Sequence, residues 1–146
     1  MAVTEVWMRE EVVLEGYHQS VRHDRQDGRK GGGVLLFVKN SLPVLDCKEM
    51  CELSFEEAVW CLVRLTNSES VLLGLCYRSP NSGIRNDEYL VNMLRKTEQL
   101  HVKHVLVMGD FNYPQIDWNA GKVEGPEDSP QAQFYETTRS LLGTKY

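Results

Sequence analysis

Polar side chains that could do chemistry follow three of the apolar segments in this chain. Thr4-Glu5 comes after Ala2-Val3, Tyr77-Arg78-Ser79-Pro80-Asn81 after residues 70–76, and Gly109-Asp110-Phe111-Asn112 after residues 104–108. In layered α/β folds, ligand sites collect beyond the strand ends, because the backbone turns there and exposes side chains. The three groups are therefore predicted to converge at one end of a sheet.

The third group offers a specific chemistry. Asp110 and Asn112 are two residues apart, so in an extended chain both side chains point to the same side while Phe111 points into the core. An aspartate can take a proton from water, and an asparagine can orient that water or hydrogen-bond a phosphate oxygen without adding negative charge. The pair suits attack on an anionic phosphodiester.

Each group also has a plain structural interpretation. Gly109–Asn112 is typical of a turn with side chain to backbone hydrogen bonds, Glu5 of a solvated carboxylate, and Tyr77 of a core aromatic at a strand end. Asn81 after Pro80 is typical of a turn. Only the joint occurrence of the groups favours catalysis.

The elements that would position these residues are mostly strands, with helices as outer layers. Strands are predicted at residues 2–5, 33–39, 58–65, 70–77 and 104–108, and the third and fourth of these should form an antiparallel hairpin. One helix should begin at the cap Asn86 and a second at the cap Ser129, with Pro130 in its first turn. Their apolar faces are expected to include Leu90, Met93, Leu94 and Leu100 in the first helix and Phe134, Tyr135, Thr138, Leu141 and Leu142 in the second.

Composition limits the class of protein. The chain has 146 residues, with 16 Lys+Arg against 21 Asp+Glu, a net charge of −5 and a pI near 5.4, which fits one ordinary globular domain. The negative charge excludes a bulk attraction to nucleic acid, so DNA binding would need a local basic patch or a metal. No apolar run approaches the roughly 20 residues of a membrane span, and the start lacks the features of a signal peptide, so we expect no membrane contact and an intracellular location, in the nucleus or cytoplasm.

The cysteines favour structural roles over a disulfide framework or a metal site. Cys47, Cys51, Cys61 and Cys76 are few and unevenly spaced, and the last two lie inside apolar runs where a small buried residue is expected. Zinc binding by the Cys47 and Cys51 pair is therefore disfavoured.

Four stretches carry a resemblance to a known family. They are Thr-Glu-Val-Trp at 4–7, Arg-Lys-Gly-Gly-Gly-Val at 29–34, Gly-Leu-Cys-Tyr-Arg-Ser-Pro-Asn at 74–81, and Val-Met-Gly-Asp-Phe-Asn-Tyr-Pro-Gln-Ile-Asp-Trp at 107–118. In order and spacing they resemble the endonuclease/exonuclease/phosphatase family, and more narrowly the apurinic-type endonuclease domain of vertebrate non-LTR (LINE, CR1-like) retrotransposons. The resemblance implies an α/β (α+β) fold, a partial four-layer α/β/β/α sandwich of the DNase I-like type. It also implies cleavage of DNA phosphodiesters that depends on Mg²⁺, with Mn²⁺ as an alternative ion.

The resemblance assigns catalytic roles to four residues. Glu5 matches the family's metal-binding glutamate, and Tyr77 matches the tyrosine that approaches the scissile phosphate. Asp110 matches the aspartate that activates the nucleophile or protonates the leaving group. Asn112 matches the asparagine that holds the phosphate in the transition state.

Contacts to phosphate and DNA are implied for a second set of residues. Asn81 lies where the family often places a phosphate-contacting asparagine. Arg25, Arg29 and Lys30, near the glycine run, are candidate contacts to a DNA backbone.

The resemblance also has departures. The family's first strand carries an asparagine, and its last strands carry an aspartate and a Ser-Asp-His triplet; residues 1–146 match neither. We therefore expect residues 1–146 to be a truncated domain with weak or no endonuclease activity, whose uncovered sheet edges favour self-association. Two alternatives stay open: a catalytically dead fragment that serves as an interaction module or has no selected role, and a family branch acting on lipid or inositol phosphates.

Overall fold

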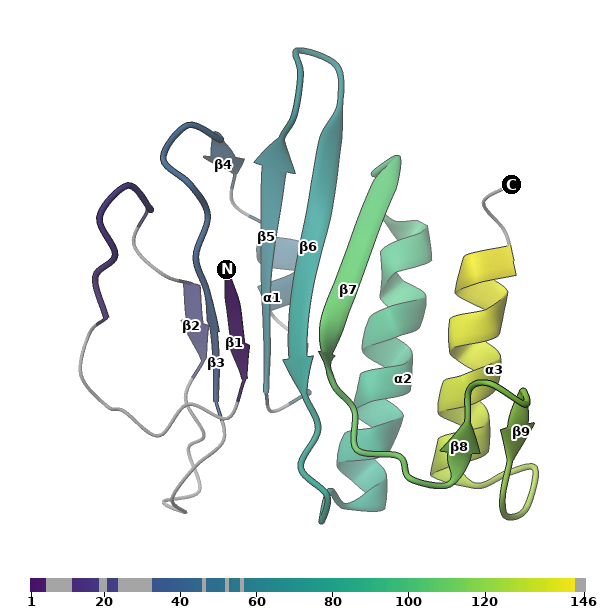
Figure 1. Cartoon of the computed structure of the whole chain (residues 1–146). Helices are drawn as coiled ribbons and strands as arrows, with labels where there is room; N and C mark the ends of the chain where they lie inside the picture. Colours follow the sequence, from purple (N-terminus) through teal and green to yellow (C-terminus); the bar gives the residue numbers. More distant parts are fainter. Residues whose placement is uncertain are drawn as a thin grey trace. The chain divides into compact units, whose positions relative to one another are not determined.

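The computed structural model describes residues 1–4, 12–18, 21–23, 33–45, 47–51, 53–55 and 57–143 (Figure 1). The chain divides into two compact units. The first comprises Met1–Glu52, Glu56–Ser79 and Val102–Phe111, and the second comprises Leu53–Phe55, Pro80–His101 and Asn112–Tyr146.

The first unit contains two sheets. Strands β1 (Ala2–Thr4), β2 (Val21–His23) and β3 (Val34–Leu36) form an antiparallel sheet in the order β1-β3-β2. Strands β4 (Val44–Leu45), β5 (Ala58–Arg64), β6 (Ser70–Tyr77) and β7 (His104–Asp110) form the second sheet in that order, with the short helix α1 (Lys48–Cys51) between β4 and β5 along the chain. The predicted hairpin is confirmed, because β5 pairs antiparallel with β6, whereas β7 pairs parallel with β6.

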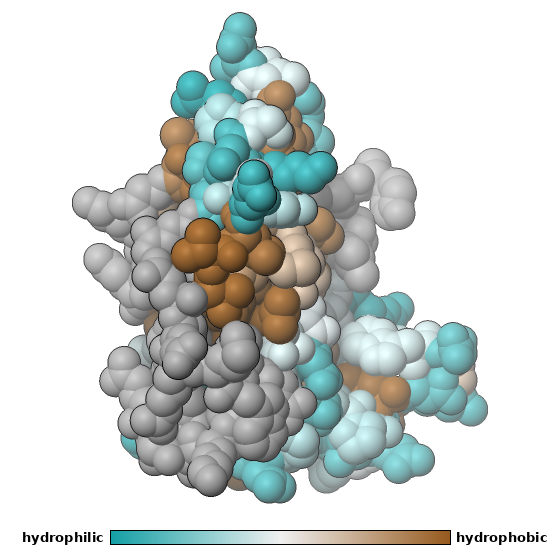
Figure 2. All heavy atoms as spheres, turned by 60° about the vertical axis from the view of Figure 1, so that its left-hand side comes forward, coloured by the Kyte–Doolittle hydropathy of each residue, from teal (hydrophilic) through white to brown (hydrophobic). Residues whose placement is uncertain are grey.

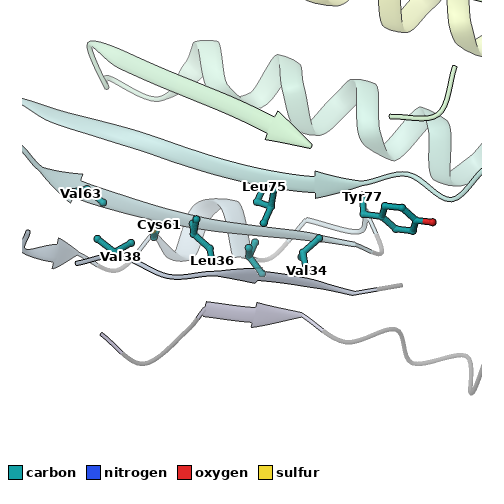
Figure 3. Close-up of a cluster of buried hydrophobic side chains, with 8 residues drawn as sticks. Val34, Leu36, Val38, Cys61, Val63, Leu75 and Tyr77 are labelled. Atoms are coloured by element: carbon teal, nitrogen blue, oxygen red, sulfur yellow. The ribbon is translucent and has the colours of Figure 1, made fainter. Parts of the chain in front are cut away.

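A core of alternating side chains joins the two sheets. Strand β3 contacts β5 and β6, and the buried residues between them come two apart along each strand, as the period of an extended chain requires. They are Val34, Leu36, Val38, Val59, Cys61, Val63, Leu75 and Tyr77 (Figure 3). This packing holds one face of β6 against β3 and so helps to position its last residue, Tyr77.

The other face of the β5–β6 hairpin carries a second close contact. Trp60 and Gly74 are register partners, and a Cβ on Gly74 would overlap the Trp60 ring. Only glycine at position 74 lets the Trp60 ring, which is 3% exposed, lie against the neighbouring backbone. The hairpin is therefore packed on both faces.

Some apolar side chains of the first unit stay exposed. They include Met1, Val13, Leu42, Val44, Leu65 and Leu106. On the face turned forward in Figure 2, apolar side chains gather in a patch with polar side chains beside it. Contiguous apolar surface of this kind is typical of an interaction site.

The second unit is built from two helices and a small hairpin. Helices α2 (Ile84–Gln99) and α3 (Pro130–Gly143) contact each other, and β8 (Ile116–Asp117) pairs antiparallel with β9 (Lys122–Val123). Among the described residues, no helix has the length and apolar character needed to cross a membrane.

Of the two predicted helix caps, one is correct and the other is wrong. Ser129 caps α3, since its Oγ accepts a hydrogen bond from the Ala132 backbone N–H at 3.4 Å, and Pro130 opens the helix. Asn86 is not a cap, because α2 begins at Ile84 after the N-cap Gly83, and the Asn86 side chain donates instead to Ser82 Oγ at 3.0 Å. The apolar face predicted for α2 is confirmed at Leu90, Met93 and Leu94, which are buried, whereas Leu100 lies past the last helical residue as the C-cap.

Candidate functional site

Tyr77 and Asp110 end two neighbouring parallel strands. They are register partners, each the last residue of its strand, β6 and β7 respectively. Parallel pairing places the carboxyl ends of both strands at the same edge of the sheet. Tyr77 is buried, with its hydroxyl pointing away from the apolar cluster, whereas Asp110 is exposed (Figure 3). The structure thus brings these two predicted site residues together.

Gly109 explains how the backbone reaches this arrangement. Its φ is +151°, and a Cβ at this position would overlap the carbonyl oxygen of Cys76 on β6. Any side chain there would push the end of β7 away from β6. The glycine before Asp110 is therefore required to hold that aspartate beside Tyr77.

Two buried charged residues border the pair, and the sequence analysis gave neither a role. Arg78, 7% exposed, donates its backbone N–H to the Asp110 carbonyl at 2.8 Å and its Nη1 to the Phe111 carbonyl at 3.5 Å. Glu57, 2% exposed, accepts the Tyr77 N–H on its backbone carbonyl at 2.9 Å. Arg78 directly follows Tyr77 in the polar group, which was a usable signal, but nothing in the sequence distinguishes Glu57 from Glu56.

Asn112 and Asn81 belong to the second unit. Strand β7 ends at Asp110, and Asn112 adopts a left-handed backbone with φ 48°, a conformation that asparagine tolerates better than most residues. The expectation that extended geometry continues from Asp110 to Asn112 is therefore wrong, and alternation along a strand cannot align their side chains. Asn81 is exposed in the turn before α2. A site that joins either asparagine to Tyr77 and Asp110 stays a prediction.

The remaining predicted site residues, Glu5, Arg25, Arg29 and Lys30, lie outside the described residues. Their roles as metal ligand and DNA contacts stay predictions. Within the described ranges, no group of three or more His, Cys, Asp or Glu side chains could hold a metal ion. The described carboxylates therefore do not by themselves make a metal centre.

The cysteines that fall in apolar runs are core residues, as predicted. Burial raises the pKa of the Cys76 thiol to about 12. Burial, together with the charge of Cys47, raises the pKa of the Cys61 thiol to about 11. Thiols held this far from ionisation are poor nucleophiles at neutral pH.

Comparison with known structures fits this geometry. The chain is similar to the endonuclease domain of TRAS1, a telomere-specific non-LTR retrotransposon, with a TM-score of 0.60 and 17% sequence identity over 89% of this chain and 54% of that one. The chain has the α/β fold of that solved domain. The α/β fold class expected for this endonuclease fold is confirmed, and the chain spans about half the length of the solved domain. No protein-family model matches the sequence, and no curated protein matches it either.

Proposed function

We propose that this chain is part of a metal-dependent endonuclease domain of retrotransposon origin, which hydrolyses DNA phosphodiesters. The observation that carries the proposal is the register pair of Tyr77 and Asp110 at one end of a sheet whose fold matches a retrotransposon endonuclease domain. They are two of the four residues to which the family resemblance assigns catalytic roles, and they come from segments far apart in the sequence.

Asp110 acts as the general base in this proposal. Its exposed carboxylate is accessible to water and to a phosphodiester, and it takes the proton of the attacking water as the water oxygen bonds to phosphorus. The bond from phosphorus to the departing nucleotide oxygen then breaks, and that oxygen takes a proton from a solvent water. Tyr77 donates its hydroxyl to a phosphate oxygen, and Asn112 and Asn81 hold the phosphate through their amides.

Arg78 has a positioning role. Its guanidinium is always protonated, and it bonds the backbone carbonyl beyond Asp110. It therefore holds the chain that carries Asp110 and adds positive potential at the edge where the substrate phosphate arrives.

The proposal includes Mg²⁺, with Mn²⁺ as an alternative ion and Glu5 as the protein ligand. Magnesium commonly binds through one or two carboxylates and keeps several waters, so a single glutamate is a sufficient protein contribution. The ion would supply charge neutralisation at the phosphate. Arg25, Arg29 and Lys30 are the proposed contacts to the DNA backbone.

We expect residues 1–146 alone to be weakly active or inactive, because they match neither the family's first strand nor its Ser-Asp-His segment. They are also expected to self-associate, since β7 has β6 as its one neighbour in the described sheet and its Leu106 side chain is 51% exposed. The buried thiols of Cys61 and Cys76 support an intracellular setting, nucleus or cytoplasm.

A plasmid-nicking assay tests the function. The chain, and a version completed with the family's C-terminal strands, are incubated with supercoiled plasmid and Mg²⁺, with and without a chelator. We expect near-background nicking by the chain and clear nicking by the completed version. In that version Asp110→Asn should lower the rate by about 10²–10⁴-fold, the usual contribution of a general base. Asp128→Asn, which removes an exposed carboxylate elsewhere, should change the rate less than about twofold.

Other outcomes would redirect the proposal. Robust nicking by the chain alone that disappears in Asp110→Asn would show that activity does not need the family segments that residues 1–146 do not match. A completed version that melts cooperatively yet leaves the plasmid intact would contradict the catalytic roles, and would favour the interaction-module alternative.

A further inference from the structure

The β8–β9 hairpin and helix α3 present an aromatic surface in the second unit (Figure 1). Trp118, which directly follows β8, is 56% exposed, although its ring centroid lies 6.4 Å from that of Phe134 and 5.5 Å from that of Tyr135. Both α3 rings therefore contact the indole, while more than half of the residue stays accessible to solvent. An exposed tryptophan that its neighbours hold in place is typical of an interaction site. Trp118 ends the fourth stretch of the family resemblance, but the proposed nuclease site gives it no role.

A pocket of about 520 Å³ adjoins this indole. Tyr135 lines the pocket and also contacts Trp118, so the two features share one ring. The volume is sufficient for an apolar side chain of a partner. The other apolar lining residues come from the hairpin, the loop after it and α3; they are Gly121, Val123, Gly125, Pro126 and Ala132.

The walls of the pocket are fixed by the backbone and by a local hydrogen bond. Gly121 and Gly125 have φ of +64° and +112°, and a Cβ on Gly125 would overlap Nε2 of Gln131. That Nε2 donates a hydrogen bond to the Glu124 carbonyl at 3.0 Å. Because the surface is already ordered, binding would cost little conformational entropy on this side of the interface.

The charges near the indole favour a cationic partner. Residues 116–139, from β8 into α3, carry five carboxylates and two cations, a net charge of −3. Glu127 and Glu136 line the pocket together with one cation, Arg139. Such a surface repels a phosphate backbone and attracts ammonium and guanidinium groups. It therefore suits a partner other than DNA.

Arg139 shows which contact the indole can make. The central carbon of its guanidinium lies 5.6 Å from the centre of the Tyr135 ring, and its Nη1 lies 3.6 Å from Glu136 Oε1. A cation over an aromatic face, with a carboxylate beside it, is thus already formed on α3. Tryptophan is the aromatic side chain that attracts cations most strongly, and the exposed part of Trp118 is accessible to a guanidinium of another chain.

We propose that this surface docks a basic peptide segment of a partner protein. An arginine of the segment stacks on Trp118, an apolar side chain enters the pocket against Tyr135, and a further cation pairs with Glu127. The docking uses none of the residues proposed for catalysis.

Titration calorimetry on the full chain tests the proposal, with the peptide acetyl-Arg-Leu-Arg-Leu-Arg-amide as the probe. We expect saturable binding, which Trp118→Leu should weaken by about fivefold or more, because leucine keeps apolar area but has no ring face. Trp118→Phe keeps an aromatic ring and should bind within about threefold of the unaltered chain. Tyr89→Leu is the matched control, because Tyr89 is an exposed aromatic residue on α2 that does not line the pocket, and it should change the affinity less than about 1.5-fold.

A second pair of variants tests the charge requirement. Glu127→Gln should weaken binding by about threefold, whereas Glu88→Gln, at an exposed position on α2 away from the pocket, should weaken it less than about 1.5-fold. An acidic peptide of the same length, acetyl-Glu-Leu-Glu-Leu-Glu-amide, and a single-stranded oligothymidine should not bind.

Three results with the probes would overturn the proposal: no binding of the basic peptide at about 1 mM, equal binding of the acidic peptide, or tighter binding of oligothymidine that Trp118→Leu abolishes. The last of these would assign the surface to nucleic acid. Equal weakening by Glu88→Gln and Glu127→Gln, with Trp118→Leu unchanged, also overturns it, because the net charge of −5 would then explain the attraction. Should Trp118→Leu fail to melt cooperatively, the comparison of Glu127→Gln with Glu88→Gln decides.

Discussion

Gly109 links the sequence motif before Asp110 to the geometry of the candidate site. Its positive φ and its approach to the Cys76 carbonyl leave no room for a side chain. A glycine beside a proposed catalytic aspartate can be mistaken for part of the chemistry. Here it acts on the backbone, because it lets β7 reach the register that puts Asp110 opposite Tyr77.

Replacing Gly109 should be costly for this reason. We expect Gly109→Ala to lower the free energy of unfolding by at least about 2 kcal/mol, from the strained φ and the overlap with Cys76. Gly83→Ala is the matched control, because Gly83 has a negative φ of −76° and no atom within 4 Å of its would-be Cβ. Gly83→Ala should lower the free energy of unfolding by about 1 kcal/mol or less. Urea unfolding measures both changes, and equal losses would contradict the steric argument.

At the level of single residues, some features of the candidate site could be predicted from the sequence and others could not. Tyr77 and Asp110 could be predicted, because each follows an apolar strand and parallel strands end at a common edge. The burial of Arg78 and Glu57 could not, since a charged residue in a sequence is normally expected to be solvated and only tertiary packing places it inside. The backbone at Asn112 could not be predicted for another reason: a periodic pattern predicts a strand but not the single residue at which the backbone turns left-handed.

At the scale of elements, residue chemistry predicted helix α3 better than helix α2. Ser129 and Pro130 together define a start, because a cap acceptor and a residue without an N–H are both suited to the first turn. Asn86 has the chemistry of a cap too, but the first bond of α2 already runs from the Asp87 N–H to the Gly83 carbonyl at 3.0 Å. The helix forms upstream of Asn86, because local packing outweighs a moderate preference for capping.

The α3 cap can be tested directly. Ser129→Ala removes the acceptor for the Ala132 N–H and should lower the free energy of unfolding by about 1 kcal/mol. Ser68→Ala, in the exposed turn between β5 and β6, serves as the control and should change it by less than about 0.5 kcal/mol. Thermal melts followed by circular dichroism measure both. A Ser129→Ala chain as stable as the control would mean that the 3.4 Å bond contributes nothing.

At the scale of the whole molecule, the comparison with TRAS1 and the exposed strand β7 both bear on whether the chain self-associates. The chain matches 54% of that solved domain, and in the described sheet β7 pairs with β6 alone. Strand edges with exposed apolar side chains are sites of pairing between chains, and a lysine placed on such a strand suppresses it.

Self-association should therefore depend on β7. Leu106→Lys is expected to shift the chain from concentration-dependent association toward monomer in sedimentation velocity. Leu65→Lys alters a similarly exposed leucine, 49% against 51%, in the turn after β5, and should leave the association unchanged. A sharply melting, monomeric unaltered chain would contradict the expectation of an open edge.

The register of β6 with β7 has a further consequence, for the order in which the chain folds. Strands β5 and β6 are joined by the short turn Leu65–Glu69, which closes through a Leu65 N–H to Glu69 carbonyl bond of 2.9 Å. The β6–β7 pair instead requires Tyr77 to meet Asp110 across the whole of the intervening chain, and the entropy of closing a loop rises with its length. Non-local pairing of this kind forms late and slows folding.

As an outer strand, β7 is also expected to open locally before the hairpin does, and hydrogen exchange would show the lower protection of its amides. The contact that assembles Tyr77 and Asp110 is thus expected to form after the β5–β6 hairpin and to open before it, so any catalytic competence would depend on the lifetime of one strand pair.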